Sequence, residues 1–315
     1  MTDLALGHGA EAVPSAAPTF EGNVSRSATE RTVGALLSAC ALVTVATTLG
    51  IVAVLVWETV AFFGQVSPVE FFTATEWTPL FVDGQFGVWP LVTGTLLITV
   101  IAAVVALPLG LLAAVYVSQF ARAGVRRVVK PALELLAGIP TVVYGYFALT
   151  FVTPLLQAVV PGLGVYNALS AGLVVGIMIL PLVASLSEDA LRAVPRRLSE
   201  GAYALGATEG EVVWQVTIPA ALSGIVASFI LALGRAVGET MIVVLAAGAT
   251  PALTLDPRES VLTMTSFIVN ATLGDAAQGS AVFQSLFAVG LLLFLITLAM
   301  NVGAQRVVRR FAEKA

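Results

Sequence analysis

The sequence predicts an all-α, polytopic membrane protein with six transmembrane helices; its composition, apolar runs and charge placement support this class. Of the 315 residues, 58% are hydrophobic and 11% are charged, and the mean hydropathy is +0.97. Soluble domains carry about 25% charged residues. No water-soluble fold can hide this much apolar surface, so we expect membrane lipid as the surroundings and no nucleic acid as a partner.

The N-terminal segment, residues 1–30, is rich in Ala, Gly, Ser, Pro and Glu and has no apolar period, which predicts a flexible tail. It does not resemble a secretory signal peptide, because Asp3 and Glu11 stand where basic residues are needed. The remaining residues, 31–315, form the expected transmembrane domain.

A helix needs about 20 apolar residues to cross a bilayer. Six runs qualify, and they lie near 33–57, 89–120, 132–160, 168–187, 220–248 and 282–302. Pro108, Pro140 and Pro181 fall inside three of these runs, where neighbouring helices can satisfy the freed carbonyl groups. Small residues that favour close helix packing are Gly94, Gly110, Gly138, Gly145, Gly172 and Gly176.

The basic residues predict the orientation, because cytoplasmic loops carry an excess of Lys and Arg. Of the 15 Lys and Arg residues, 13 precede the first run or follow the second, fourth and sixth: Arg26, Arg31, Arg122, Arg126, Arg127, Lys130, Arg192, Arg196, Arg197, Arg306, Arg309, Arg310 and Lys314. The segment 64–88 has acidic residues and no Lys or Arg. Both termini are therefore expected in the cytoplasm, and Trp57, Trp77 and Trp89 are expected in the outer interfacial belt.

Two charged residues, Arg235 and Glu239, lie within the fifth apolar run. Each charge near a bilayer centre costs roughly 2.5–3.5 kcal/mol, so intramembrane charges mark candidate functional sites. Four residues apart, they would share one helix face and partly neutralise each other. Two interpretations stay open: a structural ion pair, or an anion site in which the guanidinium binds phosphate or carboxylate.

A polar island, 200–219, separates the fourth and fifth runs on the expected cytoplasmic side. Arg196 and Arg197 precede Glu200 by four and three residues, as on one helix face, and Gly206 would break or bend that helix. The pattern is Glu-Gly-Ala, three residues, Gly, nine residues, then Val-x-Ile-Pro. By spacing alone, an ordinary helix on the membrane surface is an equal alternative.

This pattern resembles the E-A-A loop of binding-protein-dependent ABC importers, in which E-A-A is followed after three residues by Gly and after nine more by I-x-L-P. The resemblance implies a type I (MetI-like) permease core. It also implies a coupling loop, about 196–219, that docks on an ATP-hydrolysing subunit. The docking residues it implies are Glu200, Gly201, Ala202, Gly206 and Pro219; Gly201 stands where the family has Ala.

The chain has no phosphate-cradling G-x-x-x-x-G-K-[ST] motif, so we expect no ATP hydrolysis by this chain and no enzymatic activity. With one His and one Cys, we also expect no metal site and no cofactor. This absence leaves three possibilities open for the energy of transport: an ATPase partner, an ion gradient, or no energy source at all. A membrane-embedded enzyme is disfavoured, because a His or Cys cluster is lacking.

A narrower resemblance rests on ELLAGIPTVVYG at 134–145 and GRAVGETM at 234–241. These runs look like those of the high-affinity phosphate-uptake permeases, and the long segment between the first two runs is more like the PstC type than PstA. The resemblance implies a PstA-type permease partner, two ATP-binding subunits and an extracytoplasmic phosphate-binding protein in a prokaryotic plasma membrane. It maps the transport residues onto Arg235 and Glu239. Molybdate, sulfate or an amino acid stay open as substrates, as does a gradient-driven carrier.

Glu134 opens the first of these runs, four residues after Lys130. It is either half of a surface ion pair with Lys130, worth about 0.3–0.5 kcal/mol, or a gate residue near the cytoplasmic exit of the substrate pathway.

Overall fold

A computed structural model of the chain describes residues 24–79, 81, 84–274 and 277–312, in which every regular element is helical. Its contacts divide the chain into two units, Met1–Ala53 and Val54–Ala315. In the first unit, the described side chains from 30 to 51 are all exposed. The first helix, α1 (Val24–Phe63), begins inside the expected tail, and residues 1–23 of that tail lie outside the described residues.

Two parallel helices, α3 (Trp89–Val115) and α7 (Ala168–Ala193), form the centre of the second unit. The start of α7 is fixed by Asn167, whose side-chain oxygen accepts the Ser170 N–H at 2.7 Å. Pro108 and Pro181 lie inside these helices without ending them. The two expected spans are therefore confirmed with their internal prolines.

Close approach between α3 and α7 depends on glycine. A Cβ added at Gly172 would lie 2.7 Å from the Cβ of Ile101, and one at Gly110 would lie 2.7 Å from the Cβ of Val183. The expected packing role is confirmed also for Gly94, Gly145 and Gly176, each with a neighbouring segment within 3.1 Å of such a Cβ. Gly138 differs, because only carbonyl groups of its own helix are near.

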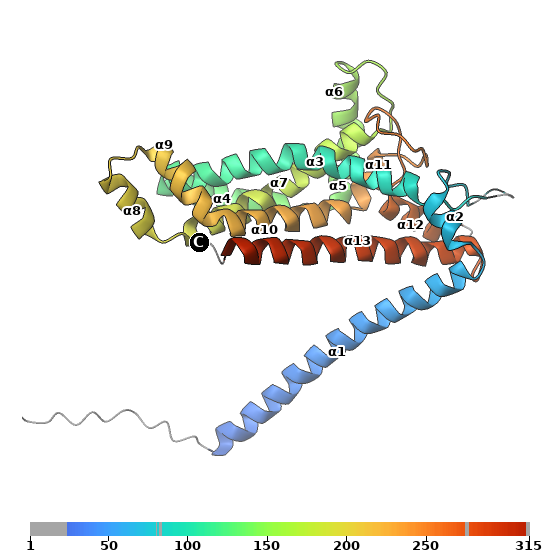
Figure 1. Ribbon diagram of the computed structural model, residues 1–315, viewed down its shortest axis with the longest axis horizontal. Helices are drawn as coiled ribbons and strands as arrows, with labels where there is room; N and C mark the ends of the chain where they lie inside the picture. Colours follow the sequence, from blue (N-terminus) through green and yellow to red (C-terminus); the bar gives the residue numbers. More distant parts are fainter. Residues whose placement is uncertain (1–23, 80, 82–83, 275–276, 313–315) are drawn as a thin grey trace, which may run out of the picture. The chain divides into compact units, whose positions relative to one another are not determined.

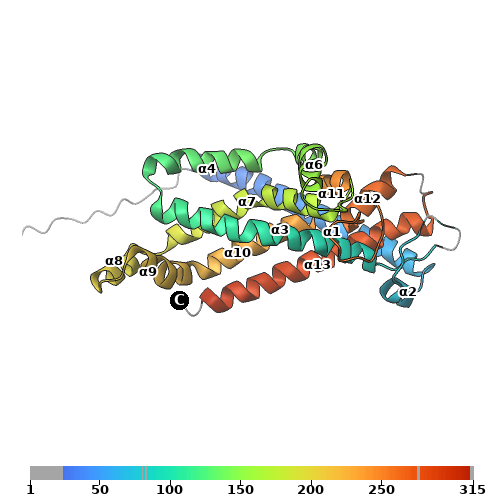
Figure 2. The same ribbon diagram turned by 90° about the horizontal axis from the view of Figure 1, so that it is seen from above.

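Two further long helices follow: α10 (Ile218–Val237) packs against α7 and α3, and α13 (Ala281–Ala312) packs against α10. Figures 1 and 2 show α3, α7, α10 and α13 running along one common direction. The short helices α8 (Arg196–Ala204) and α9 (Glu209–Glu211) lie at one end of this bundle, where α13 also ends.

The opposite end carries α2 (Pro68–Thr73), α11 (Met241–Ala246) and α12 (Met264–Leu273), as Figures 1 and 2 show. Among the described residues, five helices are long and apolar enough to cross a membrane, and one bent pair supplies a sixth crossing if its halves count together. This agrees with the six spans expected from the sequence.

The third expected span, 132–160, is the bent one. It comprises α4 (Ala123–Ala137), α5 (Thr141–Phe147), the π-helical turn η2 (Ala148–Val152) and α6 (Thr153–Gln157). The two halves meet at 87°. The bend falls at Gly138-Ile139-Pro140, because proline has no N–H to continue the helix and keeps the preceding residue out of helical conformation.

The aromatic residues near the α2 end correct one expectation. Trp77, expected in an interfacial belt, is 1% exposed and packs edge-on against Phe267, with ring centroids 4.8 Å apart. Trp57 and Trp89 are exposed, as a belt requires. Trp77 is buried because α12, almost 190 residues later in the chain, supplies the face on which it packs.

Candidate functional site

The fifth expected span is interrupted at the two charged residues. α10 ends at Val237, and α11 begins at Met241 after a break at Gly238–Thr240. Arg235 lies in the last turn of α10 with an exposed side chain, and its Nε lies 3.3 Å from the Met178 sulfur. Among the described residues, no carboxylate forms an ion pair with this guanidinium.

Glu239 is held on the α11 side of the break and is 7% exposed. Its Oε1 accepts the backbone N–H groups of Met241 (3.1 Å) and Ile242 (3.2 Å), so the carboxylate caps the start of α11. Thr265 donates its hydroxyl to the Glu239 carbonyl oxygen at 2.7 Å. The expected neutralisation by Arg235 is wrong, because the helix ends between the two residues and their four-residue spacing no longer places them on one face.

The expected docking residues form a solvent-exposed unit at the other end of the bundle. We call 196–219 the docking segment. α8 has no buried residue, and both Glu200 and Gly201 are exposed. Gly206 ends α8 with φ at +90°, a left-handed conformation that favours glycine. Its N–H donates to the Tyr203 carbonyl (2.9 Å) while the Ala207 N–H donates to that of Ala202 (3.1 Å).

The docking segment then returns to the bundle through a capped turn. Thr208 and Glu211 exchange hydrogen bonds that cap α9. The π-helical turn η3 (Val212–Thr217) follows and leads directly into Pro219 at the start of α10. Proline lacks an N–H and its ring crowds the carbonyl four residues earlier, which accounts for the wider turn at this point.

Glu134 is exposed on α4 and lines a shallow cavity of about 560 Å³ together with Lys130 and three arginines. The ion pair considered for Glu134 is not formed. Lys130 instead lies 2.9 Å from Glu188 and 2.7 Å from Asp189, both on α7. Arg126 also bonds to Glu188, whose side chain is 3% exposed.

The family is now decided by comparison with known proteins. Residues 106–313 match the family described as "Binding-protein-dependent transport system inner membrane component". The chain belongs to this permease family. It is accordingly a multi-pass inner-membrane protein and a transporter subunit rather than an enzyme.

Similar proteins cover most of this permease. It is 35% identical over 265 residues to the probable ABC transporter permease protein YqgH of Bacillus subtilis, covering 83% of this chain and 85% of the relative. The phosphate transport system permease protein PstC of Mesorhizobium japonicum is 33% identical over 310 residues, with 91% and 92% covered. PstC 1 of Mycobacterium tuberculosis is 36% identical over 288 residues, with 80% and 85% covered.

Solved permeases support the fold. A bacterial alginate ABC transporter in complex with its alginate-bound periplasmic protein aligns with TM-score 0.62 at 18% identity, covering 90% of this chain and 96% of that chain. The MetNI methionine ABC transporter in an inward-facing conformation aligns with TM-score 0.52 at 23% identity, covering 71% and 94%. The MetI-like core expected from the sequence is thereby confirmed.

The permease has a buried carboxylate, Glu188, that the sequence analysis missed. It follows the fourth expected span by one residue, so it was counted with the loop. A signal was present: Glu188 and Asp189 face the basic residues of α4 if both segments lie at the same membrane surface. Only the pairing of α4 with α7 reveals that the carboxylate is buried.

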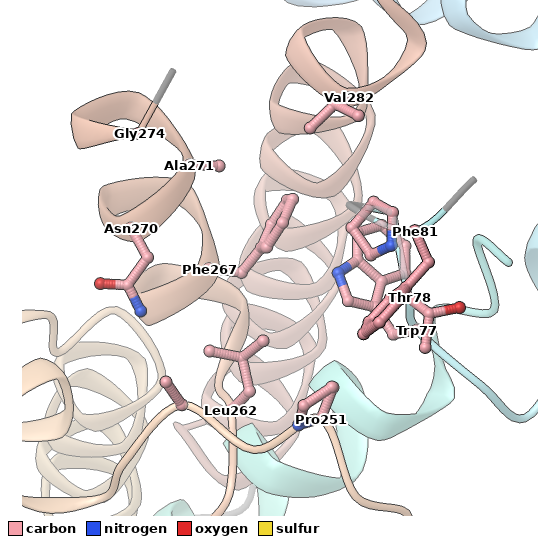
Figure 3. Close-up of a pocket in the computed structure, with 12 residues that line it drawn as sticks. Trp77, Thr78, Phe81, Pro251, Leu262, Phe267, Asn270, Ala271, Gly274 and Val282 are labelled. Atoms are coloured by element: carbon pink, nitrogen blue, oxygen red, sulfur yellow. The ribbon is translucent and has the colours of Figure 1, made fainter. Parts of the chain in front are cut away.

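An apolar pocket of the permease lies at the α2 end and has a volume of about 340 Å³. Figure 3 shows Trp77 and Phe81 on one side and Phe267 and Asn270 on the other. No charged residue is among the described residues that line it, and its buried indole N–H, on Trp77, has no described partner. This chemistry does not suit an oxyanion, which leaves Arg235 as the candidate anion contact in the spans.

Proposed function

We propose that this chain is the permease subunit of an ATP-driven phosphate importer and forms half of its translocation pathway. The observation that carries the proposal is the exposed guanidinium of Arg235, which has a thioether as its described neighbour and no carboxylate. A planar guanidinium offers paired donors to a phosphate ion. The relatives named phosphate transport permease support the same substrate.

Glu239 has a separate role in this proposal. Its carboxylate is fixed by two backbone N–H groups of α11, so it stays near the pathway without covering Arg235. A fixed negative charge keeps a passing anion from binding the arginine too tightly. The break at Gly238–Thr240 thus separates Arg235, which is free to contact the substrate, from the Glu239 carboxylate, which is held in place.

The docking segment is proposed to contact one of two ATP-binding subunits. Its exposed apolar side chains, among them Leu205 and Trp214, give such a partner a surface to bury. α13 ends on the same side as α8, so the docking segment and the end of α13 share one side. We place this side, together with both termini, in the cytoplasm because the basic residues gather in the loops expected there. A PstA-type permease would complete the pathway, and an extracytoplasmic phosphate-binding protein would deliver the ion.

Glu134 is proposed as a gate residue near the cytoplasmic exit. Its exposed carboxylate has no ion-pair partner among the described residues and stands at the rim of a basic cavity. A negative charge there would oppose the return of an anion.

The test is uptake of radiolabelled phosphate at low external concentration in cells that express this chain with its partner subunits. Arg235→Gln should reduce uptake by about 100-fold, as expected when a charge-assisted contact worth roughly 3 kcal/mol is lost. Arg122→Gln, which removes an exposed arginine outside the spans, is the matched control and should transport normally.

Three outcomes contradict parts of the proposal. Normal uptake by Arg235→Gln would show that Arg235 is not the anion contact. Uptake of molybdate, sulfate or an amino acid in place of phosphate would keep the assignment as a permease but refute phosphate as its substrate. Uptake that continues without any ATP-binding subunit would favour a gradient-driven carrier.

A further inference from the structure

A second basic site lies far from Arg235, where α8 meets the bundle. A cavity of about 210 Å³ opens there between five elements: the π-helical turn η1 (Tyr116–Phe120), α4, α7, α8 and the π-helical turn η3. A cavity needs only about 10–15 Å³ of this kind of volume to hold one water molecule, so this one has room for a phosphate group. We call it the basic pocket. Its polar lining includes Ser118, Gln119, Arg126, Arg192, Arg196 and Ser199.

The basic pocket carries more positive charge than its surroundings neutralise. No acidic residue is among those that line it. Glu188 lies behind it and is shared by Arg126, by Lys130 and, at 3.8 Å, by Arg192. With Asp189, which lies 2.7 Å from Lys130, two carboxylates serve three cations. Arg196 has no ion pair or side-chain hydrogen bond in the described part of the chain.

Neutral donors complete the lining. The Gln119 amide donates to the Ser118 hydroxyl oxygen at 2.6 Å, which leaves the Ser118 O–H free to point into the pocket. Ser199 adds a second hydroxyl one helical turn after Arg196 on α8. Guanidinium groups with hydroxyl donors are the groups that bind phosphate oxygens in proteins.

We infer that the basic pocket binds a phosphate oxyanion at the cytoplasmic surface, either free inorganic phosphate or the headgroup of an anionic phospholipid. Basic pockets between membrane helices on this side recruit such headgroups. The bound oxyanion joins Arg196 and Ser199 of α8 to Arg126 and Arg192 of the bundle. Occupancy therefore fixes the docking segment against α4 and α7.

Fixing α8 gives the oxyanion a regulatory effect on ATPase coupling. No residue of α8 is buried, so α8 by itself is weakly attached to the bundle. The binding does not depend on which solute is transported. Only its effect on coupling rests on the proposed function.

The test measures binding to the assembled importer directly. The complex is purified and reconstituted in phosphatidylcholine nanodiscs with or without phosphatidylglycerol. Retained phosphatidylglycerol is counted by native mass spectrometry, and equilibrium binding of radiolabelled inorganic phosphate is measured in the lipid without phosphatidylglycerol. Arg196→Gln should lower the affinity for the ligand that binds by about tenfold, the effect of losing one charged hydrogen-bond donor.

Arg197→Gln is the matched control, because it removes the same charge from the next residue of α8, which lines no described pocket. It should change binding by less than about twofold, the scale of a screened surface charge. Ser199→Ala weakens binding without changing charge. Arg235→Gln leaves this binding intact, which separates the basic pocket from the proposed transport contact.

Loss of retained phosphatidylglycerol in Arg196→Gln identifies the lipid headgroup, whereas loss of radiolabelled phosphate identifies the free ion. Either result supports the site even if uptake assays assign another solute to the importer. Absence of both ligands from the native complex overturns the inference. Equal weakening by Arg196→Gln and Arg197→Gln also overturns it, because binding would then depend on net charge alone.

Discussion

Replacing Glu188 by Gln should loosen the attachment of α4 to α7, because one buried carboxylate holds that contact together. Glu188 is 3% exposed, while Arg126 and Lys130 are 22% and 30% exposed. Removing one partner of a fully buried pair costs about 3–5 kcal/mol. Here the two cations can regain water, and Lys130 keeps Asp189 at 2.7 Å. We therefore expect a loss of about 2–3 kcal/mol in the free energy of unfolding.

Asp189→Asn is the matched control, since it removes one negative charge from the next residue. The Asp189 side chain is 56% exposed and, among the described residues, pairs with Lys130 alone. An exposed pair of this kind contributes less than about 1 kcal/mol and is screened by salt. The two variants should therefore differ by about 2 kcal/mol, although their change in net charge is identical.

The assay is reversible unfolding in mixed micelles of a mild detergent and dodecyl sulfate, followed by tryptophan fluorescence. It is repeated at high salt, where the Asp189→Asn effect should shrink and the Glu188→Gln effect should persist. Equal losses in the two variants would refute the reasoning, because they would show that burial of Glu188 adds nothing beyond surface charge.

Three further outcomes follow from local geometry. Gly172→Ala should cost about 1–3 kcal/mol in the same assay, because its Cβ would lie 2.7 Å from a branched side-chain carbon of α3. Gly206→Ala should lower ATPase activity stimulated by the loaded binding protein, because its φ of +90° strains any L side chain; Gly201→Ala, with open space around it, should not. Arg258 lowers the pKa of Asp256 from 3.8 to about 2, so their pairing stabilises the loop above pH 3.8 and is lost as the pH falls through 2; carboxyl NMR should show that pKa return toward 3.8 in Arg258→Gln.

The spans and much of their packing could be predicted from the sequence, because both depend on short-range patterns. Apolar runs of sufficient length fix the helices, and a glycine within such a run permits close approach wherever a neighbour arrives. Gly110 and Gly172 show this at the α3–α7 contact. Gly138 was misjudged, since its neighbour Pro140 bends the chain and no other helix approaches.

The burial of individual polar and aromatic side chains could not be predicted, because it depends on segments distant in the chain. Trp77 is covered by Phe267, and Glu188 is covered through α4. Neither contact leaves a periodic signal in the sequence. The sequence pattern indicates only that both residues lie near a membrane surface, and it does not indicate that they are buried.

The two charged centres of the chain illustrate why a charge alone does not reveal its role. At Glu188 the structure surrounds one carboxylate with cations, so its negative charge is used to hold helices together. At the break in the fifth span, backbone N–H groups satisfy Glu239 and leave Arg235 without a carboxylate partner. An unbroken helix would have placed these two residues, four apart, on one face. Because the helix ends between them instead, the arginine stays available, and that separation favours an anion contact over a structural ion pair.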